Sequence, residues 1–228
     1  MISIIIPVFN EAKTLPEFLS RLDVLVTDGE VIIVDGQSLD ETMALASKHT
    51  RADVIVTQSG RGRARQMNSG AALAHGDILL FLHADTILPL GALADIEKAL
   101  VDPDVIGGRF RVELDNKRMP YRLIGAMINI RDAMFGGFTG DQAIFVRKKD
   151  FMALGGFNEI EICEDLDLAA RMQKAGKVVQ LPAKVITSAR RWEKDGWVRT
   201  IILMWIIRIM FYLRISPKSI SQLYADTR

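Results

Sequence analysis

The amino-acid sequence predicts an α/β fold with a mostly parallel sheet that is flanked by helices. Short runs rich in Ile, Val and Leu alternate with helix-like stretches over the first half of the chain. These runs show little polar alternation, which is typical of strands buried on both faces of a parallel sheet. The length of 228 residues suits one well-packed domain.

The first half is expected to contain strands and helices in strict alternation. The expected strands are Ser3–Phe9, Val31–Asp35, Val54–Thr57 and Ile78–His83. The expected helices lie near Thr14–Val26, Asp40–Lys48 and Arg63–Ala74. Ser38 and Glu41 have the spacing of a capping box, which favours a helix start at this point. Strand–helix–strand alternation implies right-handed crossovers and a doubly wound sheet.

The second half is less regular but continues the same pattern. The elements expected there are a strand at Val105–Leu114, a helix at Tyr121–Met134, a strand at Gln142–Arg147, a helix at Leu166–Ala175 that ends at Gly176, and a strand at Val178–Thr187. The sequence contains no repeat or linker, so residues 1–195 are expected to form one domain. Residues 196–228 are expected to form an apolar helical segment packed on this domain, on a partner subunit or at the membrane surface.

Charge and cysteine usage narrow the class of protein. Lys and Arg number 29 against 28 Asp and Glu, and this balance argues against a nucleic-acid binder. The single cysteine, Cys163, excludes a disulfide framework and favours a reducing compartment. The first residues lack a basic region and a cleavage site and read as a strand, not a signal peptide. A cytoplasmic protein is expected, with contact to the inner face of the membrane left open.

The candidate metal-binding residues follow the fourth expected strand. Sheets of this type bind ligands beyond the carboxyl ends of their strands, where His83 and Asp85 are expected. Asp85 is suited to anchor Mg²⁺ or Mn²⁺, since these ions often use one or two carboxylates plus substrate phosphates. His83 is a candidate nitrogen ligand or a group that orients the site. The alternative is that Asp85 caps a turn and that His83 is a packed histidine.

Further candidates are an acidic residue after the second strand and a run of arginines. Asp35 could accept hydrogen bonds from a nucleobase or ribose, or be a turn residue bonded to its own backbone. Arg61, Arg63 and Arg65 alternate with small residues just before a helix, a pattern suited to phosphate binding. The same run is also compatible with a solvated basic turn.

Two more clusters lie in the second half. Glu164, Asp165 and Asp167 precede a helix, where acidic residues usually serve capping and the helix dipole. The functional reading is that one of these carboxylates is a general base. Arg191 and Trp192 follow an expected strand and suit diphosphate neutralisation and stacking on a sugar or base, or equally a surface patch.

The order of these features resembles the family-2 inverting glycosyltransferases of the GT-A fold, a Rossmann-like, mostly parallel sheet flanked by helices. The similarity covers roughly Ser3 to Trp192. The matching segments are Ile4–Glu11, Val34–Thr42, Asn68–Ala71, Gly76–Asp85, Gly155–Glu159 and Glu164–Asp167. The chain is particularly similar to a small bacterial subgroup with a His-Ala-Asp form of the Asp-x-Asp motif.

The resemblance implies a role for individual residues. Asp35 corresponds to the aspartate that contacts uracil, and Pro7 and Glu11 would line the nucleotide pocket. Asp85 corresponds to the metal-binding member of the Asp-x-Asp motif, and Asp165 to the base that deprotonates the acceptor hydroxyl. The implied donor is a UDP- or GDP-linked sugar, and the implied cofactor is Mg²⁺ or Mn²⁺.

Two departures from the family pattern affect what is implied. His83 replaces the first aspartate of Asp-x-Asp, which leaves the affinity for metal and the choice of metal open. Arg191 and Trp192 resemble the end of a Gln-x-x-Arg-Trp motif, but Ser188 or Ala189 replaces the glutamine. Processive polymerisation is therefore not implied.

The apolar C-terminal segment is too interrupted to span a bilayer. Trp197–Ile215 contains Arg199, Arg208 and Arg214, and its longest uninterrupted run is Thr200–Ile207. A span needs ~20 residues, and a central arginine adds ~2.5–3.5 kcal/mol to insertion. The segment is expected to lie at the membrane interface, which would fit a lipid-like acceptor, or to pack on the body or a second subunit.

Two other functions remain open at this stage. A sugar nucleotidyltransferase would share the sheet and the metal chemistry, but usually has a glycine-rich basic loop after the first strand. Asn10 and Glu11 occupy that position here. A non-catalytic nucleotide-sugar binding protein is compatible with His83, whereas the presence of Asp85 and Asp165 argues against it.

Overall fold

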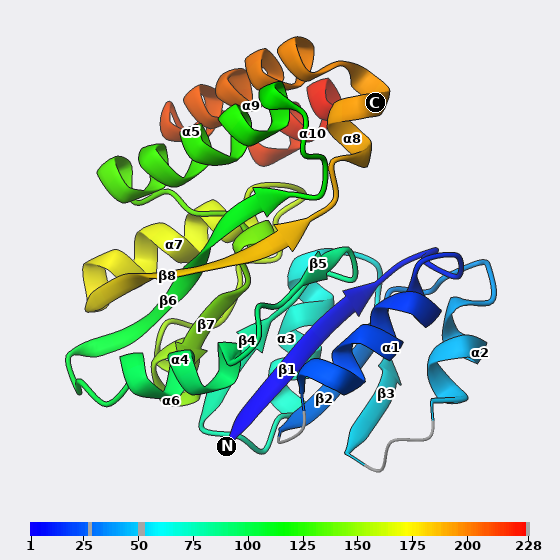
Figure 1. Ribbon diagram of the computed structural model, residues 1–228. Helices are drawn as coiled ribbons and strands as arrows, with labels where there is room; N and C mark the ends of the chain where they lie inside the picture. The colour runs from blue at the N-terminus through cyan, green and yellow to red at the C-terminus, as the bar shows by residue number, and fades with distance from the viewer. Residues whose placement is uncertain (27–28, 50–52, 227–228) are drawn as a thin grey trace.

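The computed structural model describes residues 1–26, 29–49 and 53–226. Within these ranges one sheet of eight strands runs through the molecule in the order β3-β2-β1-β4-β7-β6-β8-β5 (Figure 1). The strands are β1 (Ile2–Val8), β2 (Glu30–Asp35), β3 (Val54–Gln58), β4 (Ile78–Phe81), β5 (Thr86–Ile87), β6 (Val105–Leu114), β7 (Ile144–Arg147) and β8 (Lys177–Thr187).

The sheet is parallel in its N-terminal half and mixed beyond β4. β1 pairs in parallel with both β2 and β4, and β2 pairs in parallel with β3. β7 runs antiparallel to its neighbours β4 and β6, whereas β6 and β8 are parallel. The carboxyl ends of β1, β2 and β4 therefore meet at one edge of the sheet, as the sequence predicts.

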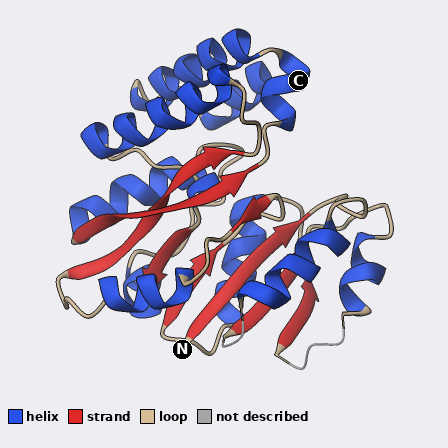
Figure 2. Cartoon of the chain, in the orientation of Figure 1, coloured by secondary structure: helices blue, strands red, loops and turns tan. Residues whose placement is uncertain are grey.

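Helices cover both faces of this sheet (Figure 2). They are α1 (Leu15–Leu25), α2 (Thr42–Ser47), α3 (Arg63–Leu73), α4 (Ala92–Ala99), α5 (Met119–Phe135), α6 (Lys148–Ala153), α7 (Glu164–Ala175), α8 (Arg190–Asp195), α9 (Trp197–Tyr212) and α10 (Pro217–Asp226), with a short 3₁₀ turn at Gly140–Gln142. One core cluster joins the sheet to α1, α4 and α5, and a second joins it to α3, α6 and α7. β1 is buried along its whole length, which explains its lack of polar alternation.

Most predicted elements are confirmed within a few residues, and the differences have local causes. The predicted capping box is wrong, because α2 begins after Glu41 and the Ser38 hydroxyl instead accepts a hydrogen bond from the Asn10 N–H. Asp40 accepts the hydrogen bond from the Thr42 N–H at the start of this helix. The fourth strand ends at Phe81, two residues before His83. The short elements β5, α4, α6 and α8 were not predicted.

The C-terminal helices lie at the end of the molecule beyond β6 and β8 (Figure 1). α9 buries Leu203 and Ile207 in a small third core cluster with Cys163 and Leu166, which flank the start of α7. Ile220 of α10 belongs to the same cluster. In the described ranges, no helix reaches the length and apolar character that crossing a membrane requires. The buried face of α9 thus supports the segment that leads into α7.

Candidate functional site

A continuous cleft lies between the carboxyl edge of the sheet and the C-terminal helices. It consists of a strand-end pocket of about 600 Å³ and a helix-side pocket of about 850 Å³. The strand-end pocket begins at Pro7, near the end of β1, and at Glu11, which follows this strand, whereas the helix-side pocket extends to α9 and α10. Arg61, His83 and Asp85 line both pockets. A single extended ligand can therefore occupy both.

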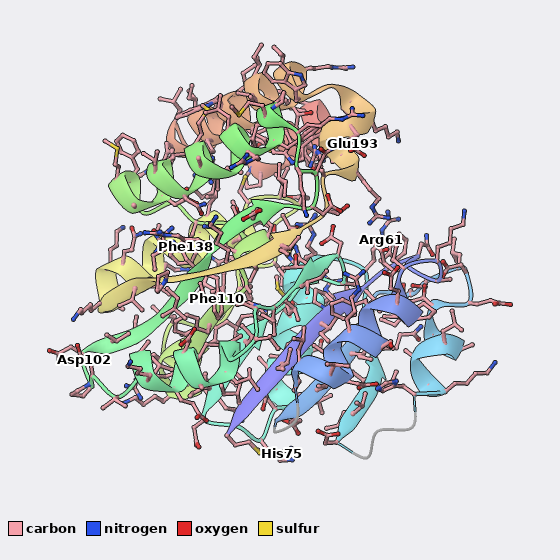
Figure 3. All side chains as sticks on the ribbon, in the orientation of Figure 1. Arg61, His75, Asp102, Phe110, Phe138 and Glu193 are labelled. Carbon is pink, nitrogen blue, oxygen red and sulfur yellow. The ribbon has the colours of Figure 1, made fainter. Side chains whose placement is uncertain are left out.

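Cationic side chains reach the strand-end pocket from two directions. Arg61 and Arg63 come from the start of α3, and Arg190 and Arg191 come from α8. Figure 3 shows Arg61 on the side of the N-terminal half that faces α8. Guanidinium groups arranged in this way suit the oxygens of a diphosphate.

Aromatic rings hold two of these arginines. The Arg61 guanidinium lies 4.5 Å from the ring centroid of Phe9, and that of Arg191 lies 4.2 Å from the ring centroid of Tyr224. The Tyr224 hydroxyl is also hydrogen-bonded to Arg191. Stacking fixes the direction of a long side chain, so the cations are partly pre-arranged for an anion.

Asp85 offers an exposed carboxylate at the end of the fourth strand region. The Thr86 hydroxyl donates to its Oδ1 at 3.4 Å, and Asp85 lines the cleft. Among the described residues no three His, Cys, Asp or Glu side chains are grouped to enclose a metal. One carboxylate completed by phosphate oxygens and water nevertheless matches the usual manner of Mg²⁺ binding. Asp85 therefore fits a metal site that the substrate completes.

His83 is partly buried beside Gly140. A Cβ atom added at Gly140 would lie 2.6 Å from His83 Nε2 and 3.8 Å from Asp165 Oδ2, so only glycine permits this close approach. Burial of the ring, followed by the positive charge of Arg63, lowers the pKa of His83. The imidazole is therefore held in its neutral form, which is the form able to ligate a metal.

Asp165 lies on the first turn of α7 and lines the helix-side pocket. Its Oδ2 accepts a hydrogen bond from the Gly140 N–H at 2.9 Å, and its Oδ1 accepts one from the Leu166 N–H at 2.7 Å. These two bonds fix the plane of the carboxylate and leave other lone pairs free for a ligand. The side chain is only partly buried. The Asp165 carboxylate is thus held in a fixed orientation in the cleft, where it can accept a hydrogen bond from a ligand.

The neighbouring Glu164 has a different environment. It is buried, and its closest cation is Arg63, whose Nη1 lies 3.8 Å from Oε1. Burial, followed by repulsion from Asp165, raises the pKa of Glu164 to about 7. Asp167, the third acid of the cluster, is bonded to Arg171 and Asn158 and does not line the cleft. The three predicted acids are therefore not equivalent.

Two predicted nucleotide-binding residues are held by other side chains of the protein. Asp35 is fully buried, and its Oδ2 accepts hydrogen bonds from the Ser38 N–H and from Gln58 Nε2, both at 3.0 Å. Its Oδ1 has no hydrogen-bond partner among the described residues, but Asp35 does not line either pocket. Arg65 lines the helix-side pocket but is paired with Glu159 at 3.0 Å. Trp192 lines the helix-side pocket.

Several cleft residues were missed by sequence analysis. Phe9 ends the predicted first strand, so an aromatic residue at a strand end was an available signal. Thr139 and Asp141 lie in the glycine-rich loop before β7 and line the helix-side pocket. Tyr224 and Arg208 reach the cleft only because α9 and α10 fold back over it. No local pattern around these last two residues indicates this position.

Comparison with known proteins gives a consistent result. The sequence profile described as glycosyl transferase family 2 matches residues 3–155. A PGL/p-HBAD biosynthesis glycosyltransferase from Mycobacterium bovis (strain BCG / Pasteur 1173P2) is 30% identical over 167 residues, which are 69% of this chain and 63% of that protein. An undecaprenyl-phosphate 4-deoxy-4-formamido-L-arabinose transferase from Pseudomonas aeruginosa (strain LESB58) is 26% identical over 140 residues, or 56% of this chain and 41% of that protein. The chain thus spans less than two thirds of the length of these relatives.

Solved structures share the fold. The mannosyltransferase PcManGT from Pyrobaculum calidifontis, in complex with GDP-Man and Mn²⁺, superposes with a TM-score of 0.72 at 22% identity and covers 99% of this chain and 69% of its own. Residues 1–349 of S. aureus TarS in complex with UDP-GlcNAc give a TM-score of 0.64 at 19% identity, with 82% of this chain and 58% of that chain covered. These similarities confirm the predicted GT-A fold.

Proposed function

Because this chain belongs to glycosyl transferase family 2, we propose that it transfers a sugar from a nucleoside diphosphate sugar to an acceptor hydroxyl with inversion. The observation that carries the proposal is the position of Asp165. Its carboxylate is oriented by two backbone N–H groups in a cleft whose other end is lined by arginines. A base at one end and cations at the other are what transfer from a diphosphate leaving group requires.

The donor is assigned to the strand-end pocket. Pro7, Phe9 and Glu11 line the part near β1, where a nucleoside would lie, and Arg61 and Arg191 are placed for its diphosphate. GDP-Man and UDP-GlcNAc in the two structural neighbours support a GDP- or UDP-linked sugar. The Asp35 side chain is fully buried, and its Oδ1 has no hydrogen-bond partner among the described residues. A contact between Asp35 and the base therefore requires that this oxygen become accessible.

A divalent cation is assigned to Asp85, with His83 as a further ligand or an orienting group. When bound, Mg²⁺ or Mn²⁺ would neutralise charge that develops on the diphosphate leaving group. The Mn²⁺ in the complex of PcManGT supports this assignment. The exposed Asp85 carboxylate and the neutral imidazole of His83 are two groups of the cleft that fit such an ion.

The reaction follows from the position of the base. Asp165 accepts the proton of the acceptor hydroxyl, while the hydroxyl oxygen forms a bond to the anomeric carbon. The bond between this carbon and the diphosphate oxygen breaks, and the nucleoside diphosphate leaves with the bonding electrons. Attack from the face opposite the leaving group inverts the anomeric centre. Because the two Asp165 oxygens are already held by Gly140 and Leu166, little reorientation is needed before proton transfer.

The acceptor is proposed to be lipid-like and presented at a membrane surface. α9 exposes Ile202, Trp205 and Ile209, and α5 exposes Leu123 and Ile130. Between Gly196 and Tyr224 the sequence contains no acidic residue and three exposed cations, Arg199, Arg214 and Lys218, besides the buried Arg208. Apolar side chains together with basic residues are typical of helices that lie in the interface of an anionic membrane.

A thermal-shift panel tests the donor and metal assignments. UDP, GDP, CDP and dTDP, with their common sugars, are added with and without Mn²⁺ or Mg²⁺. A ligand at ~100-fold its Kd stabilises the fold by ~2.7 kcal/mol, which is readily measured. We expect one nucleotide to raise the Tm in a metal-dependent manner, and Asp85→Ala to remove the metal dependence. If the Tm does not change with any nucleotide, the proposal fails in favour of a non-catalytic protein. An unchanged metal titration in Asp85→Ala would exclude Asp85 as the ligand.

A further inference from the structure

Arg208 is a buried cation in the wall of the helix-side pocket, and the transfer described above does not use it. It projects from the buried face of α9 with only 8% of its surface exposed. It lines the pocket next to Met204 and Ile207. Burial of a charged group is unfavourable unless the charge is paired and hydrogen-bonded.

The pairing of Arg208 is incomplete. Its nearest carboxylate partner is Asp132 of α5, where the distance from Arg208 Nη2 to Asp132 Oδ1 is 3.9 Å. That distance is too long for a hydrogen bond. The same Oδ1 already accepts a hydrogen bond from Arg131 Nε at 2.7 Å. Across the described part of the chain, Arg208 Nη2 has no hydrogen-bond partner.

Arg208 shares its carboxylate partner with two other arginines. Arg109 is also buried, and it donates to the backbone oxygen of Asp132 at 2.8 Å, not to its carboxylate. The Asp132 carboxylate is therefore a common neighbour of Arg109, Arg131 and Arg208, and the Asp165 carboxylate also attracts Arg208. Burial, followed by repulsion from Arg131, lowers the pKa of Arg208. A ligand anion would add a hydrogen-bonding partner for Arg208, whose Nη2 has none in the described part of the chain.

The pocket supplies room for such an anion close to the proposed base. Asp165 and Arg208 line the same helix-side pocket, which has a volume of about 850 Å³. Thr200 and Ser221 add hydroxyl groups to its wall, while Met204 and Ile207 add apolar surface. A ligand with a hydroxyl at Asp165 can therefore place an anionic group at Arg208 and an apolar part along α9.

We propose that Arg208 binds a phosphate-like anionic group of the acceptor, so that the acceptor is an anionic, amphipathic molecule. This inference rests on the proposed function, because Asp165 marks the acceptor end of the cleft. A lipid headgroup and a small phosphorylated molecule share the required chemistry. A free guanidinium can donate two parallel hydrogen bonds to two oxygens of such a group.

Calorimetric titration with hexyl phosphate, inorganic phosphate and hexanol tests the inference without turnover. Hexyl phosphate is expected to bind the wild-type protein, and Arg208→Met is expected to weaken its binding by about tenfold or more, since a hydrogen bond to a charged group is lost. Arg190→Met is the matched control, because Arg190 lines the strand-end pocket but not the helix-side pocket, and this binding event is expected to remain in place. Tighter binding of hexyl phosphate than of inorganic phosphate identifies a lipid-like acceptor. Equal binding of the two identifies a small phosphorylated one.

The outcome that overturns the inference is equal affinity of wild type and Arg208→Met for hexyl phosphate, or loss of binding in Arg190→Met alone. If Arg208→Met does not fold, Arg208→Lys decides. It keeps the charge but loses the planar fork, and its affinity is expected to be intermediate; wild-type affinity would contradict the assignment. Failure of the proposed function appears separately, as absence of nucleotide binding in the thermal-shift panel.

Discussion

Glu164 and Asp165 are adjacent in the sequence, yet the fold gives them different chemistry. Asp165 is partly exposed and bonded to two backbone N–H groups, whereas Glu164 is buried behind it. A pKa near 7 would by itself make Glu164 the better base. Its burial and its contact with Arg63 argue instead for a role in shaping the site. We therefore assign proton transfer to Asp165 on geometry.

The environment of Glu164 predicts a pH-dependent stability. Its pKa is raised from 4.5 to about 7 by folding, so the folded state binds the proton more tightly. Its stabilising contribution is complete below pH 4.5 and is lost as the pH rises through 7. Glu164→Gln should remove this loss and be more stable than wild type at pH 8, by up to about 3 kcal/mol. Urea unfolding between pH 5 and pH 8 measures the effect, and identical pH profiles for the two proteins would contradict it.

At the residue scale, strand ends were predictable from the sequence and tertiary pairing was not. His83, Asp85 and Asp165 all line one cleft. Their approximate positions could be predicted, because His83 and Asp85 follow a strand and Asp165 lies at the start of a helix that the sequence locates correctly. Asp35 was also located correctly, but its buried position behind Ser38 and Gln58 depends on how neighbouring loops fold. Arg65 is similar, since its partner Glu159 lies 94 residues away in the sequence.

At the element scale, the position of α3 on the sheet depends on Gly70. α3 is buried against β1 and β2, and a Cβ atom at Gly70 would lie 2.5 Å from Ile5 Cγ2. Ala normally stabilises a helix by ~1 kcal/mol relative to Gly. Here we expect Gly70→Ala to destabilise the protein despite this gain, because overpacking costs about 1–3 kcal/mol.

Denaturant unfolding of a double-mutant cycle isolates this contact. Ile5→Ala alone should be strongly destabilising, since Ile5 is fully buried. In the Gly70→Ala background the same change should be less destabilising, because it also relieves the close contact. Purely additive effects of the two substitutions would show that Gly70 and Ile5 are not coupled.

The elements of the first half could be predicted because each has a clear local sequence pattern. Buried parallel strands are continuous apolar runs, and the intervening helices are flanked by turn residues. The short β5 and the helices α4, α6 and α8 lack such a pattern over enough residues. The contribution of α9 to the cleft depends on long-range packing against Cys163 and Leu166, which no local pattern specifies.

At the scale of the whole molecule, the exposed faces of α5 and α9 form the apolar end of the protein. The two helices contact each other through Asp132 and Arg208, and Figure 1 shows both at the end opposite the N-terminus. We expect the protein to float with vesicles containing phosphatidylglycerol and less with neutral vesicles. Basic residues near an anionic surface contribute about 1 kcal/mol each.

Charged substitutions identify the face responsible for this binding. Ile202→Glu in α9 and Leu123→Glu in α5 should reduce flotation, since both side chains are more than half exposed. Val24→Glu in α1 is a matched control, because Val24 is an apolar residue on a different helix and is also more than half exposed. If the wild-type protein does not float and instead forms a dimer that Ile202→Glu dissociates, this face is a subunit interface.

The central claim is that Asp165 removes the acceptor proton, and the rate of sugar transfer by Asp165→Asn tests it most directly. The account predicts a loss of about 10²–10⁴-fold in kcat, the usual contribution of a general base, with unchanged nucleotide binding. Asp167→Asn, in the same helical turn but bonded to Arg171, should keep a rate close to wild type. A near-wild-type rate for Asp165→Asn, or a large loss for Glu164→Gln in its place, would contradict the assignment of Asp165 as the base.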